Sequence, residues 1–169
     1  MARVRKVAFP PESRLHADLS AAYFHDAWET QLSDSELSPA EIAGRALSST
    51  PRWVEAMLRL RNWMVKPFGV RAVGVLGRRG GPPAGGWKPG DRFSIFTVCS
   101  VGDTELVMGI DDTHLDVRIS FLVRRGAGAS SYVVSSWVKA HNWVGRIYMW
   151  PVAPFHAFIV IGMMRRVRM

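Results

Sequence analysis

Residues 109–121, GIDDTHLDVRISF, bring a histidine, three aspartates and an arginine into one short segment. His114 and Asp116 have the chemistry of a general acid and base, because an imidazole titrates near neutrality and a carboxylate can orient it. This chemistry requires both side chains to point into a cavity. The alternative is a turn followed by a strand with one polar face.

The alternation of residue types favours the turn and strand. One set of positions is apolar and holds Leu115, Val117, Ile119 and Phe121. The intervening positions are polar and hold His114, Asp116 and Arg118. Burial of the apolar set contributes roughly 1.5 to 3 kcal/mol per side chain, whereas burial of unpaired charges is unfavourable. We therefore predict that Asp111 and Asp112 form a turn, that the apolar set faces the core, and that Asp116 pairs with Arg118 on the surface.

Three more polar residues lie in or beside the apolar C-terminal segment. Asn142 is suited to cap a helix, and His141 either closes the corner between strand and helix or contacts a ligand at the mouth of a cavity. His156 is the only polar residue within 147–164, IYMWPVAPFHAFIVIGMM. It is either a core histidine with a partner or a pocket-facing group.

No pattern typical of a metal site, a nucleophile elbow or a paired-cysteine site is present. Residues 77–91, GRRGGPPAGGWKPGD, are rich in glycine but lack the GxxxxGK order of a phosphate-binding loop. We therefore interpret this segment as a mobile connector and expect no cofactor and no metal.

Hydrophobic periodicity predicts the elements that position these residues. A strand at 27–32 comes first. Ser38 and Glu41 form a capping box that begins a helix ending near Leu47, and a second helix follows from Thr50 to about Met64. The remaining pattern predicts antiparallel strands at 93–100, 105–110, 115–121 and 131–140.

The apolar segment 147–164 ends in the cations RRVR. Its length reaches the lower limit for a membrane span. Pro151, Pro154 and His156 argue against a span, so we predict a deeply buried helix, bent by its prolines and reaching Arg166.

Composition is that of a globular chain. The 169 residues form a single domain, 1–169, whose first 20 residues we expect to be flexible. The lone Cys99 and the absence of an apolar leader predict a cytoplasmic protein. The net charge of +8 is scattered, so we predict no specific binding of nucleic acid.

Three segments, 51–70, 109–121 and 141–160, resemble in order the bacterial family catalogued as domain of unknown function 2867. The order of elements is similar to the START and Bet v 1-like superfamily. This resemblance implies an α+β helix-grip fold, in which a curved antiparallel sheet packs on a long C-terminal helix, with two short helices after the first strand. It also implies a cavity between sheet and helix.

We therefore expect the domain to bind a small hydrophobic or amphipathic molecule, such as a lipid, in an apolar cavity of a few hundred Å³. The residues expected to line it are Trp53, Met57, Trp63, Met64, Phe93, Asn142, Phe155, His156 and Phe158. One alternative is a cyclase or dehydratase that uses His114, Asp116 or His141. The other is an interaction protein that uses its C-terminal helix. The sequence leaves a homodimer open and does not favour contact with a membrane surface.

Overall fold

The computed structural model of the chain describes residues 3–48, 86–126 and 129–167. Its elements are β1 (Arg5–Lys6), η1 (Arg14–Ala21), β2 (Phe24–Gln31), α1 (Pro39–Ser48), β3 (Arg92–Phe93), β4 (Phe96–Val101), β5 (Glu105–Asp111), β6 (Leu115–Arg124), β7 (Ser131–Ala140) and α3 (Trp143–Arg166). The predicted helix from Thr50 to Met64 lies outside the described residues, as does most of the loop 77–91.

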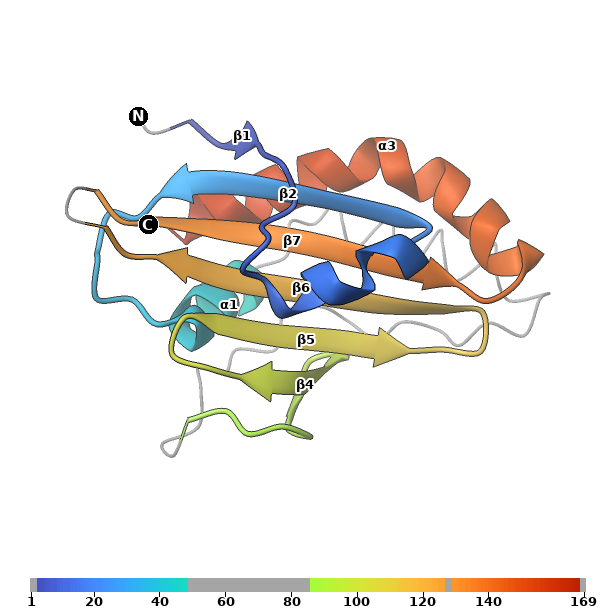
Figure 1. The fold of residues 1–169 in the computed structure, drawn as a ribbon, viewed down its shortest axis with the longest axis horizontal. Coiled ribbons are helices and arrows are strands. Elements are labelled where there is room, and N and C mark those ends of the chain that lie inside the picture. Colours follow the sequence, from blue (N-terminus) through green and yellow to red (C-terminus); the bar gives the residue numbers. More distant parts are fainter. Residues whose placement is uncertain (1–2, 49–85, 127–128, 168–169) are drawn as a thin grey trace.

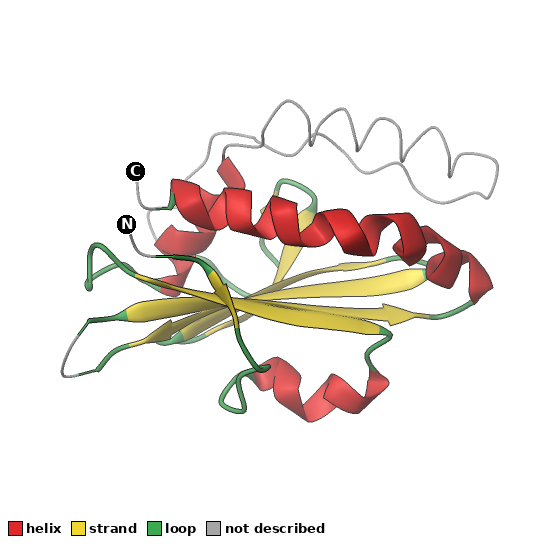
Figure 2. Ribbon diagram, turned by 90° about the horizontal axis from the view of Figure 1, so that it is seen from above, coloured by secondary structure: helices red, strands yellow, loops and turns green. Residues whose placement is uncertain are grey.

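The strands form one antiparallel sheet in the order β1-β2-β7-β6-β5-β4-β3 (Figure 1). β2 pairs with β7 along its whole length, so the second strand and the last strand of the chain are neighbours in the sheet. Figure 2 shows α1 and α3 on one side of this sheet and η1 on the other. The curved sheet with its long C-terminal helix is the helix-grip α+β architecture that the sequence predicted.

The main core lies between the sheet and the two α-helices. Apolar side chains that alternate along the strands face this layer, and Leu106, Phe121, Tyr132 and Met164 are completely buried there. The hydroxyl of Tyr132 donates to the carbonyl oxygen of Met164 at 2.8 Å. This bond ties the end of α3 to β7.

α1 begins as the sequence predicted. The amide of Glu41 donates to Ser38 Oγ at 3.3 Å, and the amide of Ser38 donates to Glu41 Oε2 at 2.9 Å. This reciprocal arrangement is the capping box, which satisfies two amides that the first helical turn leaves unbonded. The buried side of the helix, with Ile42 and Leu47, then packs on the sheet.

The second face of the sheet is covered by the N-terminal segment (Figure 2). Leu15 packs against Val107 and Trp137. The buried carboxylate of Glu105 accepts hydrogen bonds from Ser13 Oγ at 2.6 Å and from the amide of Arg14 at 3.0 Å. The N-terminal segment therefore adds a second apolar layer to the sheet.

The described end of the predicted mobile loop also differs from the prediction. Trp87 is buried and meets Phe93 edge to face, with 5.1 Å between ring centroids. Gly86 and Gly90 have φ values of 74° and 95°, which residues with a Cβ rarely adopt. The glycines thus allow a tight turn that places an aromatic anchor against β3.

α3 starts at Trp143, four residues before the predicted start, and a bend of 60° separates Trp143–Trp150 from Val152–Arg166. Proline removes an amide donor from a helix, which accounts for a bend here. Within the described chain no single helix meets the length and apolarity of a membrane span, although the two segments of α3 meet them together. The helix is not deeply buried on all sides, because Trp150 is 84% exposed and Phe158 is 65% exposed.

Candidate functional site

A polar cluster lies under α3 on an otherwise apolar face of the sheet. The period of two along β2 places Phe24, Asp26 and Trp28 on the side that faces the helix. Asp26 stands directly opposite Ser136 in the register of β2 and β7. His156 of α3 completes the cluster, so three segments far apart in the sequence contribute to it.

The imidazole of His156 contacts both polar groups through the same nitrogen. Its Nε2 lies 2.9 Å from Ser136 Oγ and 3.5 Å from Asp26 Oδ1. Phe24 meets the ring edge-on, with 5.4 Å between centroids. Nε2 therefore faces the sheet, and Nδ1 on the opposite edge of the ring has no hydrogen-bond partner among the described residues.

Asp26 is held as a buried carboxylate. Its side chain is 5% exposed, and its Oδ2 accepts from Trp28 Nε1 at 2.9 Å. Burial raises the pKa of Asp26, but the interaction with His156 and the hydrogen bond from Trp28 outweigh it, so the pKa lies below its ordinary value. Oδ1 is buried with no donor in hydrogen-bond geometry within the described chain, and longer contacts of Asp26 with His156 and Ser136 compensate its charge.

The presence of Ser136, His156 and Asp26 does not make a hydrolytic triad. In a triad the carboxylate holds one ring nitrogen while the other takes the proton of the serine. Here Ser136 and Asp26 both meet Nε2, so the carboxylate cannot hold the ring in the orientation that activates the hydroxyl. The geometry instead anchors one edge of the imidazole and presents the other.

A second group of polar residues occupies the corner between the sheet and the start of α3. His114 Nδ1 lies 2.9 Å from Asn142 Nδ2, and Asn142 Oδ1 accepts from the amide of Gly145 at 3.1 Å. Asn142 is thus the N-cap of α3, as predicted. A Cβ at Gly145 would overlap the carbonyl oxygen of His114, so this turn of the helix depends on glycine.

The acid–base pair proposed for His114 and Asp116 does not form. His141 Nε2 lies 3.0 Å from Asp116 Oδ2 instead, and both side chains are partly exposed. Because Asp116 projects to the face opposite α3 and His114 is held by Asn142, the two side chains serve different contacts.

The predicted pair of Asp116 and Arg118 is replaced by a different one. Arg118 Nη2 lies 2.5 Å from Asp111 Oδ1, because Asp111 is the last residue of β5 and faces β6 across the hairpin. The turn contains Asp112 but not Asp111. The predicted direction of the apolar set is confirmed: Leu115, Val117, Ile119 and Phe121 face the helix layer.

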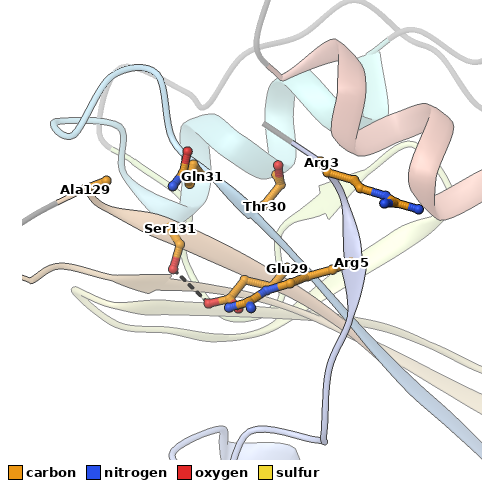
Figure 3. Close-up of a pocket in the computed structure, with 7 residues that line it drawn as sticks. All are labelled: Arg3, Arg5, Glu29, Thr30, Gln31, Ala129 and Ser131. Carbon is orange, nitrogen blue, oxygen red and sulfur yellow. Dashed lines mark hydrogen bonds and ion pairs between the residues drawn. The ribbon is translucent and has the colours of Figure 1, made fainter. Parts of the chain in front are cut away.

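A polar pocket lies at the edge of the sheet where β1, β2 and β7 meet (Figure 3). Its volume is about 500 Å³, and its lining consists of Arg3, Arg5, Glu29, Thr30, Gln31, Ala129 and Ser131. Glu29 is buried among donors. Burial raises its pKa, and hydrogen bonds from Arg5, Ser131 and Arg124 lower it further than burial raises it.

The family model described as protein of unknown function (DUF2867) matches residues 19–163. The chain belongs to this family. No curated protein matches the chain. The crystal structure of Ara h 8.0201 is similar at 13% identity and a TM-score of 0.32, with 85% of this chain and 98% of that chain covered.

The DUF2867 match includes some of the residues described above and leaves out others. It contains Asp26, Ser136 and His156, together with the corner at the start of α3. It leaves out Arg3 and Arg5, which form one wall of the edge pocket. The cluster under α3 therefore lies within the family match, whereas the edge pocket lies partly outside it.

The residues predicted to line an apolar cavity have separate locations. Trp53, Met57, Trp63 and Met64 lie outside the described residues. Phe93 is buried against Trp87, and Phe155 and Phe158 lie on the exposed side of α3. A helix that is apolar all round gives no sign of which side is buried, which explains this difference.

Sequence reasoning found His156 and missed Asp26 and Ser136. The signal available for Asp26 was its position in FHDAWETQ, where the period of two puts it on the same side as Phe24 and Trp28. Within the described chain no three His, Cys, Asp or Glu side chains are close enough to hold a metal ion.

Proposed function

We propose that this DUF2867 protein binds a small amphipathic molecule between the sheet and α3. His156 contacts the polar group of the ligand, and Asp26 and Ser136 position the imidazole. The observation that supports this function is the Asp26–His156–Ser136 cluster, a polar group held under α3 among apolar side chains.

The hydrogen bonds of the three buried carboxylates single out this site. Glu29 accepts from Arg5, Arg124 and Ser131, and Glu105 accepts from two serine hydroxyls and one amide, so each of their oxygens has a donor. Asp26 Oδ1 lacks one. A buried polar atom without a partner destabilises a fold by about 1–3 kcal/mol. A buried atom left without a donor is a candidate for a functional role.

The chemistry of the ligand follows from the free edge of His156. With Nε2 directed to Asp26 and Ser136, a neutral imidazole offers Nδ1 as an acceptor, and an imidazolium offers it as a donor. A hydroxyl group serves both states, because it donates and accepts. The apolar body of the ligand would contact the neighbouring cluster, which consists of Leu115, Val138 and Met149 with Phe24, Val117 and Tyr148.

Binding can be tested with two isomers that differ in their polar group. Octanol has a hydroxyl, whereas dibutyl ether has the same atoms and no donor. We expect His156→Ala to lower the affinity for octanol about two- to tenfold, the range for one neutral hydrogen bond, and to leave the affinity for the ether nearly unchanged. Equal affinities of wild type and variant for octanol would rule out this site. Native mass spectrometry of the purified protein then identifies any ligand carried from the cell.

A second candidate function is association with an anionic lipid surface through α3. Ile147 and Trp150 are 62% and 84% exposed and lie three residues apart on one side of the helix, and Phe158 is exposed further along. Large exposed apolar groups mark interaction surfaces, and tryptophan is enriched where proteins meet the lipid interface. The net charge of +8 complements anionic headgroups.

This second function predicts co-sedimentation with phosphatidylglycerol vesicles and little with phosphatidylcholine. The double variant Trp150→Ser, Phe158→Ser should no longer co-sediment with the phosphatidylglycerol vesicles. Val101→Ser, which alters an exposed apolar residue on β4, serves as the matched control. Equal sedimentation of the two variants would exclude α3 as the contact surface.

A further inference from the structure

We propose that the pocket between β1, β2 and β7 is a second binding site, for a small polar molecule that carries an oxyanion such as a phosphate or a carboxylate. The site is independent of α3. The residues given the anion-binding role are Arg3, Arg5 and Gln31.

The one carboxylate in the pocket is already saturated. Arg5 donates to Glu29 Oε2 through Nε at 3.2 Å and Nη2 at 2.7 Å. Arg124 and Ser131 donate to Oε1 at 3.1 and 2.9 Å. Glu29 therefore has little remaining capacity to accept bonds from a ligand, and its role is to fix Arg5 in place.

The remaining groups in the pocket are mainly donors. No carboxylate of the described chain lies within 4.0 Å of the Arg3 guanidinium. Arg5 keeps Nη1 for a ligand, since its bonds to Glu29 use Nε and Nη2. Figure 3 shows Arg5 on β1 reaching towards Glu29, Arg3 just before β1 extending in the opposite direction, and Gln31 on the neighbouring strand. Guanidinium donors favour an acceptor-rich, negatively charged partner.

The net charge around the pocket has the same sign. Three arginines, Arg3, Arg5 and Arg124, stand against two carboxylates, Glu29 and Glu12. Arg5 pairs with Glu29, and Arg124 bridges Glu29 and Glu12 at 3.1 and 2.6 Å. One positive charge is therefore left uncompensated, and it lies at Arg3. The volume of about 500 Å³ exceeds what a bare ion fills, so the pocket fits an oxyanion attached to a small polar body.

Calorimetric titration with glycerol phosphate, glycerate and glycerol tests this site. We expect the phosphate or the carboxylate to bind at one site per chain and glycerol not to bind, and the stronger of the two anions identifies the headgroup. Arg3→Gln should lower the affinity for that anion about tenfold or more, the loss expected for a charge-assisted hydrogen bond.

The matched control is Arg92→Gln. Like Arg3, Arg92 is an exposed arginine, but it lies on β3 at the opposite edge of the sheet. Its replacement should leave the affinity for the anion unchanged. The proposal is overturned if neither anion binds at about 10 mM, the weak end of small-ligand affinities. It is equally overturned if Arg3→Gln binds as the wild type does, or if Arg92→Gln weakens binding as much as Arg3→Gln.

Discussion

Replacement of Asp26 by Asn probes the buried cluster with almost no change of shape. The carboxamide can still accept from Trp28, but its amide group then faces Nε2 of His156, and the negative charge beside the imidazole is lost. Hydrogen bonds to charged groups contribute about 1.5–3 kcal/mol. We therefore expect Asp26→Asn to lower the free energy of unfolding by about 2 kcal/mol at neutral pH.

The pH dependence of this loss has a definite sign. The pKa of Asp26 is lower in the folded chain than its ordinary value. Ionised Asp26 therefore stabilises the fold above the pKa of the unfolded chain, about 4, and this contribution disappears as the pH falls through the folded pKa. The difference between wild type and Asp26→Asn should therefore shrink as the pH falls below about 4.

Urea unfolding followed by tryptophan fluorescence measures both effects. Asp116→Asn is the matched control, because Asp116 also faces a histidine but on the exposed side of the sheet. Surface ion pairs contribute about 0–1 kcal/mol, so this control should change stability by less than half as much. Equal losses for the two variants, or a difference for Asp26→Asn that stays constant down to pH 3, would refute the assignment of Asp26 as a buried charged partner.

Two further substitutions test how the layers are held. Glu105→Ala removes the acceptor for Ser13, Arg14 and Ser120. We expect it to lower the free energy of unfolding by about 3 kcal/mol and to speed amide hydrogen exchange in η1. An unchanged exchange rate would contradict the role of Glu105. Gly145→Ala places a Cβ against the His114 carbonyl. Helix propensity alone would stabilise this variant by about 1 kcal/mol, and we expect the overlap to outweigh that gain, so that the free energy of unfolding falls below that of the wild type. A stabilised variant in thermal unfolding would show that this contact can relax.

The features that sequence predicted well are local. The capping box of α1 and the Asn142 cap depend on residues three apart, and the direction of side chains in β6 follows from its alternation. The packing of α3 on the sheet was predicted from the resemblance to a family and not from these local patterns.

The features that were missed depend on long-range register. Asp26 and Ser136 meet only because β2 lies beside β7, and His156 reaches them only at one rotation of α3 about its axis. An apolar helix gives no signal for that rotation, so Phe155 and Phe158 were placed inward and the structure has them exposed. The pocket at Arg3 depends in the same way on β1 pairing with β2.

The two proposed sites share β2 and can still be separated by experiment. Asp26 and Glu29 are three residues apart, so their side chains project to opposite faces of the sheet. Asp26 reaches His156 under α3, whereas Glu29 fixes Arg5 at the edge. If the sites are independent, His156→Ala should weaken octanol without changing the affinity for the anion, and Arg3→Gln should do the reverse. A loss of both ligands in either variant would mean that the strand itself has shifted, and would place both binding sites on one coupled element.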